Sequence, residues 1–196
     1  RRYSWHSKHI AELYDDINML DNGEDHLLGS IVCLTSNHGV GINELELVDG
    51  QQRATTIMLF LNAMEEKYKT LGRSKDAEKL GNYLYCTNFD GKQQNKLVLG
   101  DLDRTDFDLI MKNMNLDGVV NQRLLQGHRL VVSLIDKLTP EKLDAFKYKF
   151  TNRASLIRLD VAESKDAFKL FESINNRGLS LSPADIIKNF LLGNAS

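Results

Sequence analysis

The stretch ELELVDGQQRATT, residues Glu44 to Thr56, joins a predicted strand to a predicted helix through one glycine. Residues Glu44–Val48 alternate polar and apolar side chains, as a half-buried strand does, and a helical pattern follows from about Gln52 to Leu71. A strand that turns tightly into a helix aims unpaired backbone N–H groups and the positive end of the helix dipole at one point. We therefore expect an anion site at this junction.

The side chains of this junction suit a charged ligand. Arg53 supplies a planar donor fork for phosphate or carboxylate, Thr55 and Thr56 supply hydroxyls, and Asp49 is suited to hold a metal ion or orient a water. Arg53 stands four residues before Ile57, so we expect it on the buried stripe of its helix, where an unpaired charge is costly. The alternative is an internal ion pair from Arg53 to Asp49 or another acid.

Outward from the junction, the sequence predicts more helices than strands. The expected helices are Ser7–Met19, Gln52–Leu71, Lys75–Tyr85, Arg104–Met114, Gln122–Lys137, Pro140–Phe150, Ser164–Asn176 and Pro183–Leu192. The expected strands are His26–Leu34, Glu44–Val48, Lys96–Leu99 and Ser155–Val161, with a loop at Thr35–Asn43. The apolar stripe of the Gln52–Leu71 helix is expected to consist of Ile57, Phe60, Leu61, Met64 and Tyr68. This mixture predicts an α+β fold.

Two further segments carry candidate binding residues. Asn175, Arg177 and Lys188 gather around a turn between two predicted helices, where solvated charges are the alternative interpretation. The N-terminal segment RRYSW, residues 1–5, holds the only Trp of the chain beside arginines. Arg2 and Trp5 could stack on a base or nucleotide, or Trp5 could anchor the first helix.

Composition excludes several classes of protein. The chain of 196 residues carries 25 Lys and Arg against 27 Asp and Glu, a net charge of -2, so it is not a globally basic nucleic-acid binder. Cys33 and Cys86 form neither a CxxC pair nor a disulfide framework, which indicates a reducing, cytoplasmic location. No apolar run reaches the length of a membrane span. Because the chain starts at Arg1 without Met, we expect it to be part of a longer protein.

Three motifs in this order resemble those of the GmrSD restriction endonuclease N-terminal-domain family. Arg2, Tyr3 and Trp5 match the opening motif, although Arg1 stands where glutamine is usual, and LLGSIV at 27–32 matches a strand motif. The hallmark Asp-Gly-Gln-Gln-Arg-x-Thr-Thr stands at 49–56, with Ala54 where leucine is usual. The late motif is matched by Phe171, Asn175, Arg177, Gly178, Leu181, Ser182, Asp185 and Lys188. Residues 1–196 are therefore expected to form a single domain of this type.

The resemblance implies a fold and an activity. The core should be a small mixed sheet similar to the ParB/sulfiredoxin fold, surrounded by a majority of helices. Relatives use the domain to bind and hydrolyse nucleoside triphosphates with Mg²⁺, and couple this to the restriction of modified phage DNA. Their nuclease usually resides in a C-terminal or separate HNH-type domain. No such domain is present here, so no nuclease activity is expected from this chain alone.

Carried over residue by residue, the resemblance assigns Asp49, Gln52 and Arg53 to catalysis, with Asp49 also holding the metal ion. The residues it assigns to nucleotide binding are Gly50, Gln51, Thr55, Thr56, Arg2, Trp5, Asn175, Arg177 and Lys188. The implied partners are a nucleoside triphosphate of unspecified base, modified DNA through the full-length protein, and the nuclease.

Two other functions remain open on the sequence. The same pocket could hold a nucleotide or a DNA phosphate without hydrolysing it, in a regulatory module that acts through partners. Alternatively, the helices could pack against a second copy of the chain in an oligomerisation scaffold.

Overall fold

The computed structural model describes residues 2–21, 23–35, 44–88, 90–114 and 116–163. These residues divide between two compact units. The helical unit consists of Arg1–His26 and Gln52–Ala154, and the sheet unit consists of Leu27–Gln51 and Ser155–Ser196. The boundary inside the hallmark motif therefore falls between Gln51 and Gln52, so the motif contributes residues to both units.

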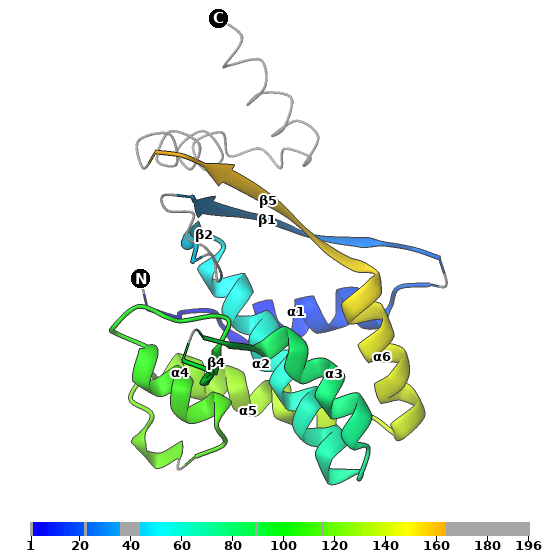
Figure 1. Cartoon of the computed structure of the whole chain (residues 1–196). Coiled ribbons are helices and arrows are strands. Elements are labelled where there is room, and N and C mark those ends of the chain that lie inside the picture. The colour runs from blue at the N-terminus through cyan, green and yellow to red at the C-terminus, as the bar shows by residue number, and fades with distance from the viewer. Residues whose placement is uncertain (1, 22, 36–43, 89, 115, 164–196) are drawn as a thin grey trace, which may run out of the picture. The chain divides into compact units, whose positions relative to one another are not determined.

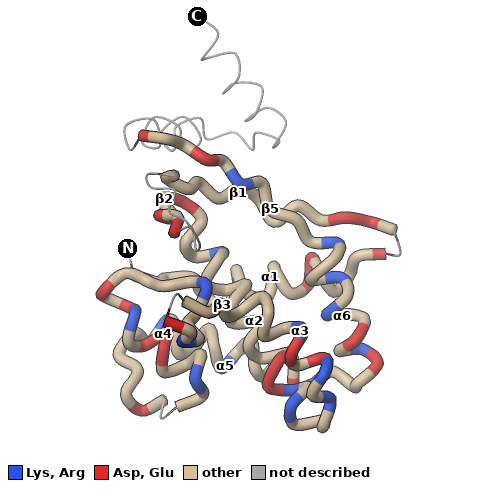
Figure 2. Tube along the Cα trace, viewed as in Figure 1, with Lys and Arg blue, Asp and Glu red and all other residues tan. Residues whose placement is uncertain are grey.

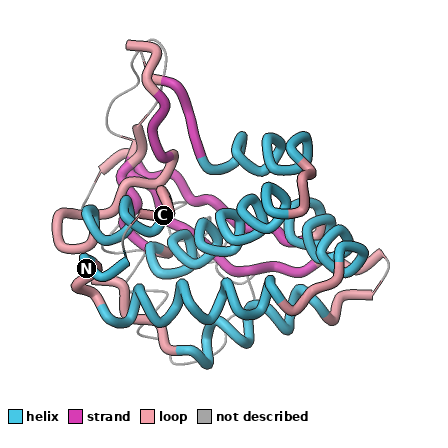
Figure 3. Tube along the Cα trace, turned by 90° about the horizontal axis from the view of Figure 1, so that it is seen from below, coloured by secondary structure: helices cyan, strands magenta, loops and turns pink. Residues whose placement is uncertain are grey.

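The helical unit contains the helices of the described chain (Figures 1 and 3). They are α1 (Ser7–Asn18), α2 (Gln51–Thr70), α3 (Ser74–Leu84), α4 (Arg104–Met111), the short 3-10 helix η1 (Leu116–Gly118), α5 (Gln122–Asp136) and α6 (Pro140–Asn152). Gln51, the first residue of α2, is the one residue of these helices that belongs to the sheet unit. No helix among the described residues is long and apolar enough to cross a membrane.

Helix α2 is the centre of the helical unit because it packs against three other helices. The ring of Phe60 lies 6.3 Å from that of Tyr14 on α1, and 6.1 Å and 5.6 Å from those of Phe146 and Phe150 on α6. The amide of Asn62 donates to a carbonyl oxygen of α4. The middle of α2 is consequently buried on nearly all sides, from Met58 to Glu65. Burial of these aromatic rings, together with the aliphatic side chains around them, stabilises this core.

A two-stranded hairpin interrupts the helices of this unit. Strands β3 (Tyr85–Thr87) and β4 (Gln93–Asn95) pair in antiparallel fashion. The carbonyl oxygen of the Asn88 side chain accepts hydrogen bonds from the N–H groups of Asp90 and Lys92, and this turn sets the register. The expected strand at Lys96–Leu99 was wrong, because the turn places Gln93–Asn95 opposite β3 and leaves the more apolar residues beyond the ladder.

The sheet unit is built on three strands in the order β2 (Glu46–Asp49), β1 (His26–Leu34) and β5 (Ala154–Val161). Strands β1 and β2 are antiparallel, whereas β1 and β5 run in the same direction (Figure 1). The core of this unit consists of Val32, Leu34 and Val161. The expected α+β class, with a small mixed sheet and a majority of helices, is confirmed.

Most expected elements were found within a few residues of their predicted ends. The helix expected at Arg104–Met114 ends at Met111, because Asn113 adopts a left-handed conformation with φ 49° that terminates it. Helix α3 ends at Leu84 because Tyr85 already belongs to the hairpin. The helices expected at Ser164–Asn176 and Pro183–Leu192, and most of the loop at Thr35–Asn43, lie outside the described residues.

Candidate functional site

The turn between β2 and α2 requires glycine at position 50. The backbone of Gly50 has a φ of +88°, which side chains other than glycine rarely adopt. A Cβ atom added at this position would also lie 2.6 Å from Cγ2 of Ile31 on β1. Asp49, the last residue of β2, pairs opposite Val32 of the same strand β1. The position of the turn is therefore constrained by the packing of Gly50 against Ile31 and by the pairing of Asp49 with Val32, both within the sheet unit.

Gln51 fastens the start of α2 to the strand that precedes it. Its Nε2 atom donates a hydrogen bond of 2.8 Å to the carbonyl oxygen of Leu47. The first turn of α2 contains no acidic residue, so no side chain of that turn opposes an anion at the positive end of the helix. Asp49 and Arg53 are both half-buried, and Arg53 is engaged in an interaction within the chain.

The expectation that Arg53 continues the buried stripe of α2 was wrong. Ile57 is only half-buried, like Arg53, whereas Thr56 and Phe60 are fully buried. The reason is that the first turn of α2, from Gln51 to Ala54, is only half-buried, whereas the helix is buried on nearly all sides from Met58 to Glu65. Partial exposure lowers the cost of the Arg53 charge and leaves part of its side chain open to solvent.

Gln52 holds the N-terminal segment against the first turn of α2. Its Oε1 atom accepts hydrogen bonds from the backbone N–H groups of Ser4 and Trp5, at 2.7 Å and 3.2 Å. Its Nε2 atom donates to the carbonyl oxygen of Arg2 at 3.0 Å. One side chain thus satisfies three backbone groups of residues 2–5, and the structure brings Arg2 and Trp5 to the start of α2.

Tyr3 anchors the same segment in the core of the helical unit. Its hydroxyl lies 2.8 Å from Oγ1 of Thr56. Since Thr56 donates its own hydrogen to the carbonyl oxygen of Gln52, at 2.9 Å, Tyr3 is the donor in this pair. Burial raises the pKa of Tyr3 to about 12. In the structure the Thr56 hydroxyl therefore holds Tyr3 in place. A contact of this hydroxyl with a phosphate stays a prediction.

Two buried polar residues that the sequence analysis missed complete this anchor. The backbone N–H of Tyr3 donates to the carboxylate of Asp103, immediately before α4. The side-chain amide of Asn121 donates to the carbonyl oxygen of Tyr3 at 3.1 Å and to Oδ1 of Asp103 at 2.8 Å. Both side chains are at most 6% exposed. Asn121 carries a sequence signal as the N-cap of α5, but only the tertiary structure shows that its amide reaches Tyr3.

The side chains of Arg2 and Trp5 are not part of this hydrogen-bonded anchor. Arg2 is exposed, and Trp5 is half-buried with its ring stacked on that of His9 at 5.7 Å. We name residues 2–5, held by Gln52, Thr56, Asp103 and Asn121, the anchored segment. It presents one guanidinium and the only indole of the chain from a backbone that is held at every residue.

The remaining predicted residues can be placed only in part. Asn175, Arg177 and Lys188 lie outside the described residues. Thr55 is buried and engaged in an interaction within the chain. Among the described residues, no three His, Cys, Asp or Glu side chains are grouped as a metal site. A single carboxylate such as Asp49 nevertheless fits Mg²⁺, which often binds through one carboxylate together with phosphates and waters.

The comparison with known families follows the same residues. A family model described as the GmrSD restriction endonuclease, N-terminal domain, matches residues 1–192. The match extends from the anchored segment through the β2–α2 turn and over both units, and the chain belongs to this family. No curated protein matches the chain. Membership makes the chain a component of a restriction system of the kind that defends against phage.

Proposed function

We propose that the chain is the nucleoside-triphosphate-binding and hydrolysing regulatory domain of a modification-dependent restriction system. The β2–α2 turn and the first turn of α2 bind the phosphates. The exposed part of Arg53 stabilises negative charge on them, as preorganised cations do in phosphoryl transfer. A nucleotide contact through Asn175, Arg177 and Lys188 belongs to the same proposal.

The observation that carries this proposal is the anchored segment. Gln52, Asp103 and Asn121 together engage backbone groups of every residue from Arg2 to Trp5. Such an arrangement preorganises Arg2 and Trp5 beside the first turn of α2, where a cation and a flat ring suit a nucleotide. In this arrangement Gln52 acts through the segment it holds, as a positioning residue.

Asp49 is the candidate metal ligand. Mg²⁺ bound with a nucleotide neutralises charge on its phosphates. Asp49 ends β2 one residue before the turn, so its place in the fold is set by its pairing with Val32. The cutting of modified DNA is assigned to an HNH-type nuclease outside this chain, and hydrolysis here controls that nuclease.

The experiment that tests the proposal is phosphate release by the chain with each nucleoside triphosphate and Mg²⁺. We expect Arg53→Ala to lower the rate about 100-fold or more, the usual effect of removing one preorganised charge-stabilising group. The matched control is Arg129→Ala, since Arg129 is an exposed arginine on α5.

The outcomes separate the proposal from its main rival. Unchanged hydrolysis by a folded Arg53→Ala variant would contradict the proposal. Nucleotide binding without phosphate release, in this chain and in the longer protein, would identify a non-hydrolysing regulatory module instead.

A further inference from the structure

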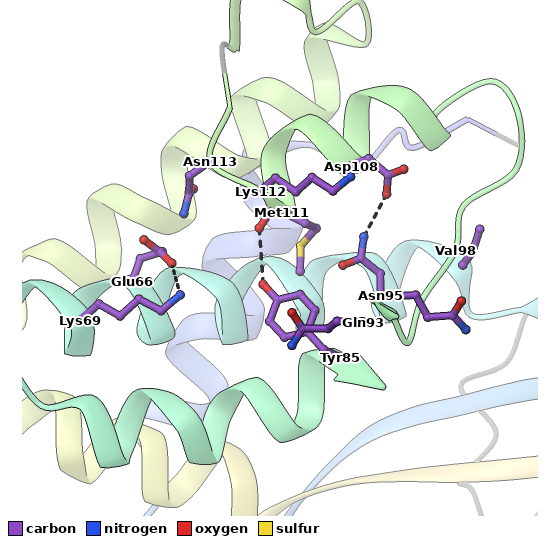
Figure 4. A pocket seen from close by; sticks show the side chains of 11 residues that line it. Glu66, Lys69, Tyr85, Gln93, Asn95, Val98, Asp108, Met111, Lys112 and Asn113 are labelled. Atoms are coloured by element: carbon purple, nitrogen blue, oxygen red, sulfur yellow. Dashed lines mark hydrogen bonds and ion pairs between the residues drawn. The ribbon is translucent and has the colours of Figure 1, made fainter. Parts of the chain in front are cut away.

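A second concave site lies at the other end of α2, within the helical unit. It is a pocket of about 430 Å³ between α2, the β3–β4 hairpin and α4 (Figure 4). Its lining includes Glu66, Lys69, Tyr85, Gln93, Gln94, Asn95, Val98, Asp108, Met111, Lys112 and Asn113. Pockets for small molecules have volumes of roughly 300–1,000 Å³, so this one is large enough for a small ligand.

The charges that line the pocket are balanced. Lys69 pairs with two carboxylates of its own helix, at 3.0 Å from Oε1 of Glu65 and 2.7 Å from Oε1 of Glu66. Asp108 accepts a hydrogen bond of 2.9 Å from the amide of Asn95, and Lys112 adds one positive charge. A polyanion would gain little here, since the carboxylates offset both lysines. The pocket therefore favours a ligand that is polar but uncharged.

Amide groups dominate the polar lining. Gln93 and Asn95 lie on the same face of β4 as Tyr85, which pairs opposite Asn95, and Asn113 follows α4 in the left-handed conformation that asparagine tolerates. In the described part of the chain, the side-chain amides of Gln93 and Asn113 have no hydrogen-bond partner. Each such amide presents one acceptor and two donors side by side. This combination matches the edge of a heterocyclic base, which alternates donors and acceptors.

The other part of the lining is aromatic and apolar. The hydroxyl of Tyr85 lies 3.4 Å from Oε2 of Glu65 and 3.5 Å from the carbonyl oxygen of Met111, and these two acceptors share its single hydrogen. Figure 4 shows the Tyr85 ring and the Met111 thioether among the amides. A ring and a polarisable sulfur suit the face of a flat ligand. Val98, 60% exposed, adds an apolar side chain to the lining.

The pocket is separate from the phosphate site proposed above. Glu66 stands 14 residues after Gln52 on the same helix, which corresponds to roughly 21 Å at 1.5 Å per residue. A base in this pocket and phosphates at the first turn of α2 are therefore too far apart to belong to one compactly bound nucleotide. The inference that follows is independent of the proposed function.

We propose that this pocket binds a nucleobase, with the amides of Gln93, Asn95 and Asn113 on its edge and Tyr85 and Met111 on its face. The base can come from a free nucleoside or from a single-stranded nucleic acid. Both sources present the same base edge and the same base face to the pocket.

The test is an NMR titration of the ¹⁵N-labelled chain, in which the side-chain NH₂ signals of these amides report binding directly. The probes are the four nucleosides, the corresponding short single-stranded oligonucleotides, and sorbitol as a neutral polyol. We expect the pocket amides to shift with at least one nucleoside or oligonucleotide, while the exposed Gln126 of α5 stays unchanged. Shifts with nucleosides identify a free ligand, and shifts with oligonucleotides alone identify a base within a strand.

Variants separate a real site from surface effects. Asn113→Gly keeps the left-handed backbone and removes the amide, and Gln93→Glu removes the donors. Each should weaken binding about five- to tenfold, the effect of about one lost hydrogen bond, while Gln126→Glu should not. The proposal is overturned if no nucleoside or oligonucleotide moves the amide signals, or if sorbitol moves them equally.

The same titration distinguishes this proposal from the proposed function. Inorganic tripolyphosphate should leave the pocket amides unmoved, and Arg53→Ala should leave nucleoside binding intact. Nucleoside binding in the pocket, with no triphosphate bound through Arg53, would support this inference and contradict the proposed function.

Discussion

Gly50 carries two separate constraints, one from its backbone and one from its neighbour. The positive φ alone disfavours any side chain, and the close approach of Ile31 leaves no room for a Cβ atom. Gly72 provides a matched comparison, because it has a φ of +72° with nothing within 4 Å of an added Cβ atom. The difference between the two glycines isolates the contribution of the close approach.

We expect Gly72→Ala to lower the free energy of unfolding by about 1 kcal/mol, the cost of a left-handed alanine. Gly50→Ala should cost about 1–3 kcal/mol more, because the added methyl group overpacks the turn against β1. Urea unfolding of the two variants measures the difference. Equal losses would show that Ile31 yields to the methyl group without cost.

Gln52 holds the anchored segment against α2. Its side chain joins α2 to the backbone of Arg2, Ser4 and Trp5 through hydrogen bonds of 2.7 to 3.2 Å. Because Trp5 is the only Trp of the chain, its fluorescence reports on this segment alone.

We expect Gln52→Ala to release the anchored segment while the helices stay folded. The anisotropy of Trp5 should decay faster and acrylamide should quench its emission more strongly, since Ser4 and Trp5 lose their acceptor. The free energy of unfolding should fall by about 0.5–1.5 kcal/mol, as expected for partly exposed hydrogen bonds. Gln126→Ala on α5 is the control. Unchanged Trp5 mobility in Gln52→Ala would show that Asp103 and Asn121 hold the segment without Gln52.

At the scale of elements, a cluster of charges joins α2, α3 and α6. Arg73, between α2 and α3, pairs with Asp76 of α3 at 2.7 Å and with Asp144 of α6 at 2.8 Å. Lys147 of α6 lies 2.8 Å from Asp76, and the hydroxyl of Tyr68 donates to Asp144 at 2.6 Å. Figure 2 shows the basic and acidic residues interleaved on α3 and α6.

This cluster makes stability dependent on pH in the acid range. The hydrogen bond from Lys147 lowers the pKa of Asp76, and the hydrogen bond from Arg73 lowers that of Asp144. A carboxyl group with a lowered pKa in the folded state binds fewer protons than in the unfolded state. Its contribution is therefore complete above the ordinary pKa of aspartate, about 4, and is lost as the pH falls through the lowered value.

We expect Asp76→Asn to destabilise the chain at pH 7 and to have a smaller effect at pH 2, because the contribution of the charge is lost as the pH falls through the lowered pKa of Asp76. Glu78→Gln, at an exposed position of the same helix, should change little at either pH. Thermal unfolding at both pH values measures this. An effect of Asp76→Asn that is as large at pH 2 as at pH 7 would show that packing, and not charge, is responsible.

The sequence predicted elements wherever the apolar pattern was strong. The run HLLGSIVCL identified β1 from His26 to Leu34, and the spacing of Ile10, Leu13 and Ile17 identified α1. Strand β4 could not be found in this way, because Gln93, Gln94 and Asn95 are polar and their pairing depends on the turn at Asn88. Strand propensity favoured the apolar residues just after β4, but these residues do not form a strand.

Only the part of the candidate site that is formed by neighbouring residues in the sequence could be predicted. The glycine turn and the start of α2 follow from residues 44–56 themselves. The contacts of Tyr3 with Asp103 and Asn121 join residues more than 90 positions apart, and no spacing rule reveals them. The burial of Thr56 and the partial exposure of Arg53 also depend on which helices pack around α2.

At the scale of the whole molecule, one hallmark motif connects two compact units. Asp49, Gly50 and Gln51 belong to the sheet unit, and Gln52 to Thr56 belong to the helical unit. The chain has a net charge of -2 and therefore no general attraction for polyanions. Binding of a phosphate ligand must therefore come from local groups, and Arg53 is the cation among the residues of the hallmark motif.

The most direct test is calorimetric titration of the chain with each nucleoside triphosphate and Mg²⁺, for the wild type, Arg53→Ala and Arg129→Ala. We expect binding by the wild type and by Arg129→Ala, and none by a folded Arg53→Ala variant. Failure of the folded wild type to bind any nucleoside triphosphate, or equal affinity in Arg53→Ala, would contradict the proposed function.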